Sequence, residues 1–239
     1  NDLLCMKFTL VRSDSNQSCK DLSAPKRLVF AYARMTMSAL LFNRDPQKIL
    51  IVGLGGGTLP EAFFDLLDNV KIDTVEIDPA VIKVAKEYFL FEDNERKRVI
   101  AQDARVFIKR AILQSTEYDL VILDAFNGDY IPEHLMTKEF LLEVQKVLSR
   151  DGVLVANTFG TSKLYDYESN TYQDVFGSFI NYKRPETGNR LIIVPQAKLD
   201  FEEREPINAA ELIQTARELE SKMSELEVPI IRYAKGLPR

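Results

Sequence analysis

The stretch ILIVGLGGGTLPEAFFDLLDNVKIDTVEIDP, residues 49–79, decides the fold of this chain. Its apolar start does not alternate with polar residues, which is typical of a parallel strand covered on both faces. A glycine cluster and a helical pattern follow, and a second short strand ends at Glu76. The stretch therefore predicts a strand, a glycine turn, a helix and a second strand. The glycines are Gly53, Gly55, Gly56 and Gly57.

The glycine turn and Glu76 together predict a nucleoside site. Glycine permits positive φ and leaves no Cβ between the backbone and a ligand, and a carboxylate at the next strand tip can accept two ribose hydroxyls. No lysine follows the glycines as in a phosphate loop, and Thr58 breaks the dinucleotide pattern GxGxxG. The observed GxGxG spacing favours a ligand of the S-adenosylmethionine type. The alternative is a turn that only allows tight packing.

Composition narrows the class of protein. The chain has 239 residues, 46% of them hydrophobic and 28% charged, which is ordinary for a globular domain with a small appendage. The net charge of −5 argues against nucleic acid as a partner and permits a small cationic substrate. No apolar run is long enough for a membrane span, so we expect no membrane contact and a cytoplasmic protein.

The cysteines give a second expectation about the compartment. Cys5 and Cys19 form no CxxC pattern, and His134 is the only histidine. We therefore expect no metal site, and we expect both cysteines to be reduced thiols.

Strands alternate with helices along most of the chain. After the first unit, the pattern predicts strands at 98–102, 120–124 and 152–159, and then two strands at 175–183 and 190–196 joined too closely for a crossover. This is an α/β, doubly wound sheet of five parallel strands with a C-terminal antiparallel hairpin. The apolar seam of a last helix is expected to pack on the sheet, with a subunit contact as the alternative. Its residues are Leu212, Ala216, Leu219, Met223 and Leu226.

Two regions follow from this pattern. Residues 1–46 are predicted as an N-terminal module, with a β-hairpin whose first strand covers 6–12 and a helix at 27–41. Residues 47–239 form the Rossmann-like domain that would bind the nucleoside.

Acidic residues mark the carboxyl ends of three predicted strands. Ligands of open parallel sheets bind there, so Glu76, Asp103 and Asp124 form a candidate site. Asp78 is better explained as a helix cap. The loop after Asp124 is long enough for a lid, and we expect His134 within it to be an exposed residue rather than a participant in acceptor binding.

Several of these motifs resemble the spermidine synthase family of aminopropyltransferases, over residues 48–158. They are VEIDPAVIKVAKEYF, AQDARVFIK, YDLVILDAF and DGVLVAN, and GLGGGTLPEAF with DAFNGDYIPEHLMTKEF resembles bacterial spermidine synthase-like proteins. The resemblance implies a class I methyltransferase-like fold and a homodimer. It also implies transfer of an aminopropyl group from decarboxylated S-adenosylmethionine to an amine such as putrescine.

The resemblance assigns a role to each matching residue. Asp124 would be the base, Glu76 would hold the ribose, and Asp103 with Ala104 would contact the adenine. Gly53, Gly56 and Gly57 would line the nucleoside, and Gly55 stands where the family carries an aspartate. Gln17 matches a family glutamine. On the amine side are Tyr32, Asn127, which replaces a second aspartate, and Asp129 as its nearest substitute.

These departures leave three functions open. The first is a spermidine synthase-like transferase with a changed acceptor site. The second is a methyltransferase that uses S-adenosylmethionine itself, because Gly55 leaves room for the carboxylate that decarboxylation removes. The third is a relative that binds a nucleoside without turnover.

Overall fold

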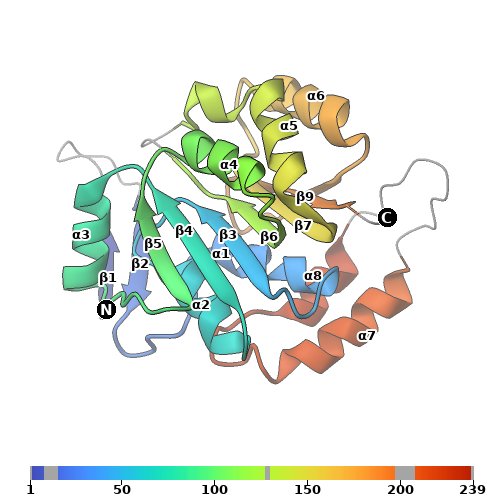
Figure 1. Ribbon diagram of the computed structural model, residues 1–239. Helices are drawn as coiled ribbons and strands as arrows, with labels where there is room; N and C mark the ends of the chain where they lie inside the picture. The colour runs from blue at the N-terminus through green and yellow to red at the C-terminus, as the bar shows by residue number, and fades with distance from the viewer. Residues whose placement is uncertain (1, 8–15, 127–129, 197–207, 238–239) are drawn as a thin grey trace.

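The computed structural model describes residues 2–7, 16–126, 130–196 and 208–237. A seven-stranded sheet with the order β5-β4-β3-β6-β7-β9-β8 crosses its centre (Figure 1). Neighbours among β3 to β7 pair in parallel, and β9 pairs antiparallel with both β7 and β8. The predicted doubly wound sheet with its C-terminal hairpin is confirmed. The strands are β3 (Lys48–Val52), β4 (Lys71–Glu76), β5 (Lys97–Ala101), β6 (Tyr118–Leu123), β7 (Leu148–Phe159), β8 (Ile180–Lys183) and β9 (Asn189–Pro195).

The strand order places the candidate site. The chain moves outward from β3 to β4 and β5, and then returns to the other side of β3 with β6. The carboxyl ends of β3 and β6 therefore lie side by side at the point where the order reverses, which is where open sheets bind ligands. Gly53 follows β3 and Asp124 follows β6.

Helices cover both faces of the sheet (Figure 1). Buried side chains of α4 (Ala104–Leu113), α5 (Lys138–Val147) and α6 (Tyr165–Phe176) form one core cluster with the sheet. The opposite cluster holds α1 (Ala31–Thr36), the short 3-10 helix η1 (Met37–Leu41), α2 (Thr58–Leu66), α7 (Ala209–Glu220) and α8 (Ile230–Gly236). The helix predicted for 27–41 thus begins at Ala31.

The N-terminal residues form a small sheet of their own. Strands β1 (Leu3–Met6) and β2 (Ser18–Asp21) pair antiparallel, so the predicted hairpin is present, although its first strand starts earlier than expected. Residues 8–12 of the predicted strand lie outside the described residues. Met6 packs with Phe89, just after α3 (Pro79–Tyr88), in a third core cluster. The hairpin therefore stands beside the edge of the sheet that carries α3.

The expectation of reduced thiols is wrong. Cys5 and Cys19 face each other across the β1–β2 ladder and are joined by a disulfide. Their Cα atoms are 4.1 Å apart, and directly opposed strand positions bring side chains this close. The sequence argument rested on the expected compartment and did not consider the register of the hairpin.

The predicted strand at 175–183 is too long at its start. Val175 and Phe176 belong to the last turn of α6, and Phe176 is buried against Tyr172, one helical turn earlier, with ring centroids 6.0 Å apart. Gly177 ends the helix with φ 75°. Apolar residues at helical spacing were mistaken for the beginning of β8.

The apolar seam near the C-terminus is part of the core. The five predicted seam residues are at most 7% exposed and belong to the cluster that α7 and α8 share with the sheet. The expected packing is confirmed. Asn208 caps α7, because its Oδ1 accepts from the amides of Ala210 and Glu211. Within the described ranges, no helix is both long and apolar enough to span a bilayer.

Candidate active site

The glycine turn after β3 packs against the carboxyl end of β6. Gly53 has φ 100°, and a Cβ there would lie 2.3 Å from the carbonyl oxygen of Asp124. Its amide donates to the carbonyl of Val75 at 2.8 Å. Glycine at 53 therefore lets the two strand ends approach, which fixes the position of Asp124 at the site.

Gly56 and Gly57 have a packing role. A Cβ at Gly56 would meet the ring of Phe89 at 2.4 Å, and one at Gly57 would meet the ring of Phe91 at 2.5 Å. Gly57 also begins α2 with φ 77°. The packing explanation left open by the sequence thus applies to these two glycines, and a role toward a nucleoside stays a prediction.

Gly55 lies under the N-terminal hairpin. It has φ 54°, and a Cβ there would lie 3.5 Å from Cβ of Ser18 on β2. Ser18 is itself buried. The hairpin therefore closes one side of the glycine turn.

Glu76 is held by two backbone amides. Its Oε2 accepts from Leu54 at 3.0 Å, and its Oε1 accepts from Asp78 at 3.0 Å. A carboxylate oxygen can accept more than one hydrogen bond, so both oxygens keep capacity for a pair of hydroxyls. This orientation beside the glycine turn fits the predicted ribose contact. Asp78 caps α3 through Ala80, as expected.

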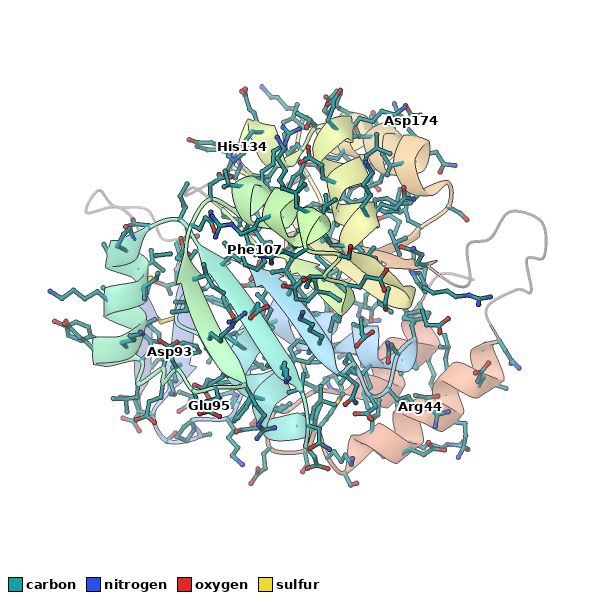
Figure 2. The ribbon with its side chains drawn as sticks, in the orientation of Figure 1. Arg44, Asp93, Glu95, Phe107, His134 and Asp174 are labelled. Carbon is teal, nitrogen blue, oxygen red and sulfur yellow. A yellow bond between two sulfur atoms is a disulfide. The ribbon has the colours of Figure 1, made fainter. Side chains whose placement is uncertain are left out.

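Asp103 meets the only histidine of the chain. One carboxylate oxygen caps α4, which begins at Ala104, by accepting a hydrogen bond from the amide of Val106. The other oxygen lies 3.0 Å from Nε2 of His134, which belongs to the 3-10 helix η2 (Glu133–Leu135). His134 is exposed, and Figure 2 shows it near α4, toward the top of the view. The segment after Asp124 therefore returns to the predicted adenine edge.

Asp124 is the half-buried acid of the site. Its Oδ1 accepts from Nδ2 of Asn157 at 2.8 Å, and its Oδ2 accepts from the hydroxyl of Tyr32 at 3.3 Å. Burial raises the pKa of Asp124 to about 7, against the lowering effect of these two hydrogen bonds. Burial and the neighbouring carboxylate also raise the pKa of the Tyr32 phenol well above its ordinary value. The predicted base and the predicted substrate residue Tyr32 thus lie in contact.

A chain of polar side chains supports Asn157. Its Oδ1 accepts from Nδ2 of Asn189 at 2.9 Å, and Oδ1 of Asn189 accepts from the hydroxyl of Thr187 at 2.6 Å. These bonds fix which end of the Asn157 amide faces Asp124. The strands β7 and β9 therefore position the donor that holds the acid.

A cavity of about 460 Å³ opens beside Tyr32 and Asn157, within the size range of small-ligand sites. Two aromatic pairs line it, a stacked one (Phe30 with Tyr32) and an edge-to-face one (Phe126 with Phe159). Gln17 also lines this cavity, which places it on the Tyr32 side of the site. Asn127 and Asp129 lie outside the described residues. The cavity suits an alkyl chain with a cationic end, because aromatic faces attract both.

The sequence argument missed Asn157 and Asn189. Asn157 lies near the carboxyl end of β7, where Glu76 and Asp124 mark the ends of their own strands. The same strand-end rule, applied to amides as well as acids, would have found it. Asn189 could not be found in this way, because its contact with Asn157 depends on the antiparallel pairing of β7 with β9, in which Asn157 lies opposite Leu191.

The chain matches a known protein family. The family model for the spermine/spermidine synthase domain matches residues 29–197, which include Tyr32, the glycine turn, all three strand-end acids and Asn157. The chain belongs to the spermine/spermidine synthase family. It is thereby a member of a transferase family.

Relatives of this family member include both aminopropyltransferases and methyltransferases. A polyamine aminopropyltransferase of Vibrio vulnificus (strain CMCP6) is 48% identical over 97% of this chain and 76% of its own length. An eEF1A lysine and N-terminal methyltransferase of Mus musculus is 32% identical over 55% of this chain and 20% of its own length.

Solved structures show the same fold. A probable spermidine synthase from Corynebacterium glutamicum has a TM-score of 0.68 at 22% identity, covering 93% of this chain and 84% of that one. Human methyltransferase-like protein 13, solved in complex with SAH, has a TM-score of 0.68 at 26% identity, covering 81% of this chain and 90% of that one. The fold thus spans two kinds of transferase.

Proposed function

We propose that this spermidine synthase family member transfers the aminopropyl group of decarboxylated S-adenosylmethionine to a small amine such as putrescine. The observation that carries the proposal is Asp124, a half-buried carboxyl with a pKa of about 7, held by Tyr32 and Asn157 beside an aromatic cavity. The similarity to the Vibrio vulnificus aminopropyltransferase supports the same reaction.

The chemistry needs an acid of this kind. An alkylammonium ion is no nucleophile until it loses a proton, and a base works best with a pKa near the operating pH. Ionised Asp124 would attract the ammonium ion and then take its proton. The amine nitrogen would form a bond to the propyl carbon while the carbon–sulfur bond breaks, which releases a neutral thioether. Alignment of the two substrates away from water would supply much of the rate.

The nucleoside end has a matching set of residues. Glu76 would accept the ribose hydroxyls, and its two backbone hydrogen bonds hold it in place for that role. Asp103 and Ala104 would contact the adenine, and the glycine turn would lie under the nucleoside. Gln17 and Tyr32 would face the substrates from the cavity wall, with Asn127 and Asp129 on the loop after Asp124.

The amine site is proposed to differ from that of a typical family member. Two family acids are replaced by Gly55 and Asn127, so affinity for the dication putrescine should be weak. Isothermal titration with putrescine in the presence of methylthioadenosine tests this: weak binding is expected, and tight binding would refute the changed site.

Methyl transfer from S-adenosylmethionine itself is the second candidate. Gly55 stands where the family carries an acid, and the methyltransferase structure solved with SAH has the same fold at 26% identity. A thermal-shift comparison of the two cofactors and methylthioadenosine separates the candidates, since a ligand at 100 times its Kd adds about 2.7 kcal/mol to stability. Stronger stabilisation by the decarboxylated form supports aminopropyl transfer, and stronger stabilisation by the intact form refutes it. No shift with any of the three favours the non-enzymatic alternative.

A homodimer in the cytoplasm completes the proposal. The family resemblance supports the homodimer. The Cys5–Cys19 disulfide argues against the cytoplasm, because reducing compartments keep thiols unpaired. Thiol trapping of protein taken directly from cells decides between the cytoplasm and an oxidising compartment.

A further inference from the structure

Four arginines gather around a second cavity, of about 220 Å³. Arg27 precedes α1, Arg34 lies on α1, Arg184 follows β8 and Arg232 lies on α8. Arg34 also lines the cavity beside Tyr32, as does Glu186, so the two cavities share these walls. The reaction proposed above assigns no role to any of these four arginines.

Positive charge exceeds negative charge around this cavity. Arg27 is paired with Asp21 at 3.0 Å and with Glu227 at 2.8 Å. Arg184 and Arg232 instead share one carboxylate oxygen, Oε1 of Glu186.

Arg34 adds a third guanidinium group. Its Nη1 donates to the carbonyls of Leu28 and Val29, and in the described part of the chain it forms no ion pair with a carboxylate. Arg184 and Arg232 thus share Glu186, and Arg34 adds a positive charge without a carboxylate partner of its own among the described residues. The arrangement leaves net positive charge where an anion would be stabilised.

Two buried donors near this charge lack a partner among the described residues. They are Nε of Arg184 and the hydroxyl of Tyr182. Tyr182 is fully buried, and Arg184, Glu186 and Arg232 all act on it electrostatically. Arg184 lines the cavity, so an oxygen acceptor there would recover the free-energy cost of its unpaired buried N–H group.

Gly236 makes room for the Arg184 side chain. A Cβ at this position in α8 would lie 2.7 Å from Nη1 of Arg184. The glycine therefore allows Arg184 to run along α8 with only 15% of its side chain exposed, while Arg232 at the cavity mouth stays 60% exposed. The site has a buried donor within and an open entrance.

The geometry points to a binding site for a small oxyanion, a carboxylate or phosphate group, between Arg34, Arg184 and Arg232. Guanidinium groups match the oxygens of such anions and can bind them in pairs of hydrogen bonds. The oxyanion could be free in solution, or it could be a carboxylate carried by the acceptor amine, because the cavity shares Arg34 and Glu186 with the cavity beside Asp124.

Phosphate titration of the whole chain tests the site. Isothermal titration with inorganic phosphate, at ionic strength held constant with chloride, is expected to give one site per chain. Arg184→Gln should weaken it about tenfold or more, as the loss of a hydrogen bond to a charged group does. The matched control Arg44→Gln alters an arginine that pairs with Glu218 on α7 and should leave the affinity unchanged. Equal affinity in wild type and Arg184→Gln, or no phosphate binding at millimolar concentration, would overturn the proposal.

Two further arms keep the result interpretable. Arg232→Gln changes a lining side chain that is 60% exposed, so the variant should fold normally and yet bind phosphate more weakly; unchanged affinity in a folded variant counts against the site. Titration with 4-aminobutyrate in the presence of methylthioadenosine identifies the source. Displacement of phosphate by this amine supports the site with the acceptor's carboxylate as its ligand, and phosphate binding without displacement supports the site with a free anion. Phosphate binding needs no turnover, so these outcomes are independent of the proposed reaction.

Discussion

The hydroxyl of Tyr32 donates to Oδ2 of Asp124 at 3.3 Å, across 92 positions of sequence. Tyr32 comes from α1 on one face of the sheet, and Asp124 comes from the end of a central strand. This contact joins the N-terminal region to the proposed base. It also makes α1 part of the wall that separates the base from solvent.

Replacing Asp124 with Asn should remove the base and leave the nucleoside site intact. General base catalysis contributes about 10²–10⁴-fold, so kcat/KM should fall by that range. Affinity for methylthioadenosine should stay the same. Asp174→Asn is a matched control, because Asp174 is an exposed residue on α6 that pairs with Lys138 (Figure 2). Full activity in Asp124→Asn would show that another group accepts the proton.

The pH profile should report the ionisation of Asp124. Because the pKa of Asp124 is raised to about 7, the active carboxylate form gains population as pH rises through 7, and kcat/KM should rise with it. Asn157 donates a hydrogen bond that lowers this pKa, so Asn157→Ala should move the rise to higher pH. The variant should lose more activity at pH 7 than at pH 8.5. A profile that is parallel to wild type would contradict the role of Asn157.

Stability should depend on pH through the same carboxyl. The folded-state pKa of about 7 exceeds the ordinary value of 3.8, so between these values the folded state holds a proton that the unfolded state has lost. The stabilising contribution of the protonated Asp124 carboxyl is complete below about pH 4. It is lost progressively as pH rises from there through 7, by about 1.4 kcal/mol per pH unit. Chemical denaturation of wild type and Asp124→Asn at several pH values checks this: the difference between them should change with pH, and a constant difference would contradict the raised pKa.

Glu76→Gln should weaken binding of the nucleoside. The change removes the charge that receives the ribose hydroxyls, and a hydrogen bond to a charged group is worth about 1.5–3 kcal/mol. The Kd for methylthioadenosine should rise about tenfold or more. Glu87→Gln is the control, because Glu87 is an exposed helix residue paired with Lys83. An equal Kd in wild type and Glu76→Gln would move the ribose elsewhere.

The disulfide should stabilise the N-terminal hairpin and report on the compartment. Cys5→Ser with Cys19→Ser should lower the free energy of unfolding by about 2–4 kcal/mol relative to oxidised wild type. Thiol trapping of protein taken directly from cells measures the state of the pair. Cysteines that do not react with the trapping reagent are oxidised and would place the chain in an oxidising compartment. Cysteines that do react are free thiols and would support the cytoplasm.

The sequence was sufficient for the sheet because each parallel strand has its own local signal. The run at 49–52, for example, is apolar, short and followed by glycine, and it became β3. The acids at the strand ends could also be predicted, because their place follows from the strands themselves. Two missed features depend on contacts between separate segments, the Cys5–Cys19 register and the Asn189 support of Asn157. The third, the last turn of α6 at Val175, was missed because its apolar residues also fit a strand. Local patterns do not contain pairing partners, so these features needed the structure.

Product analysis tests the central claim most directly. The protein is incubated with putrescine and either decarboxylated or intact S-adenosylmethionine, and the nucleoside products are identified by mass spectrometry, with Asp124→Asn as the inactive reference. Aminopropyl transfer predicts methylthioadenosine and an aminopropylated amine from the decarboxylated form, in equal amounts and dependent on Asp124. Formation of S-adenosylhomocysteine from the intact form, without methylthioadenosine from the other, would contradict it.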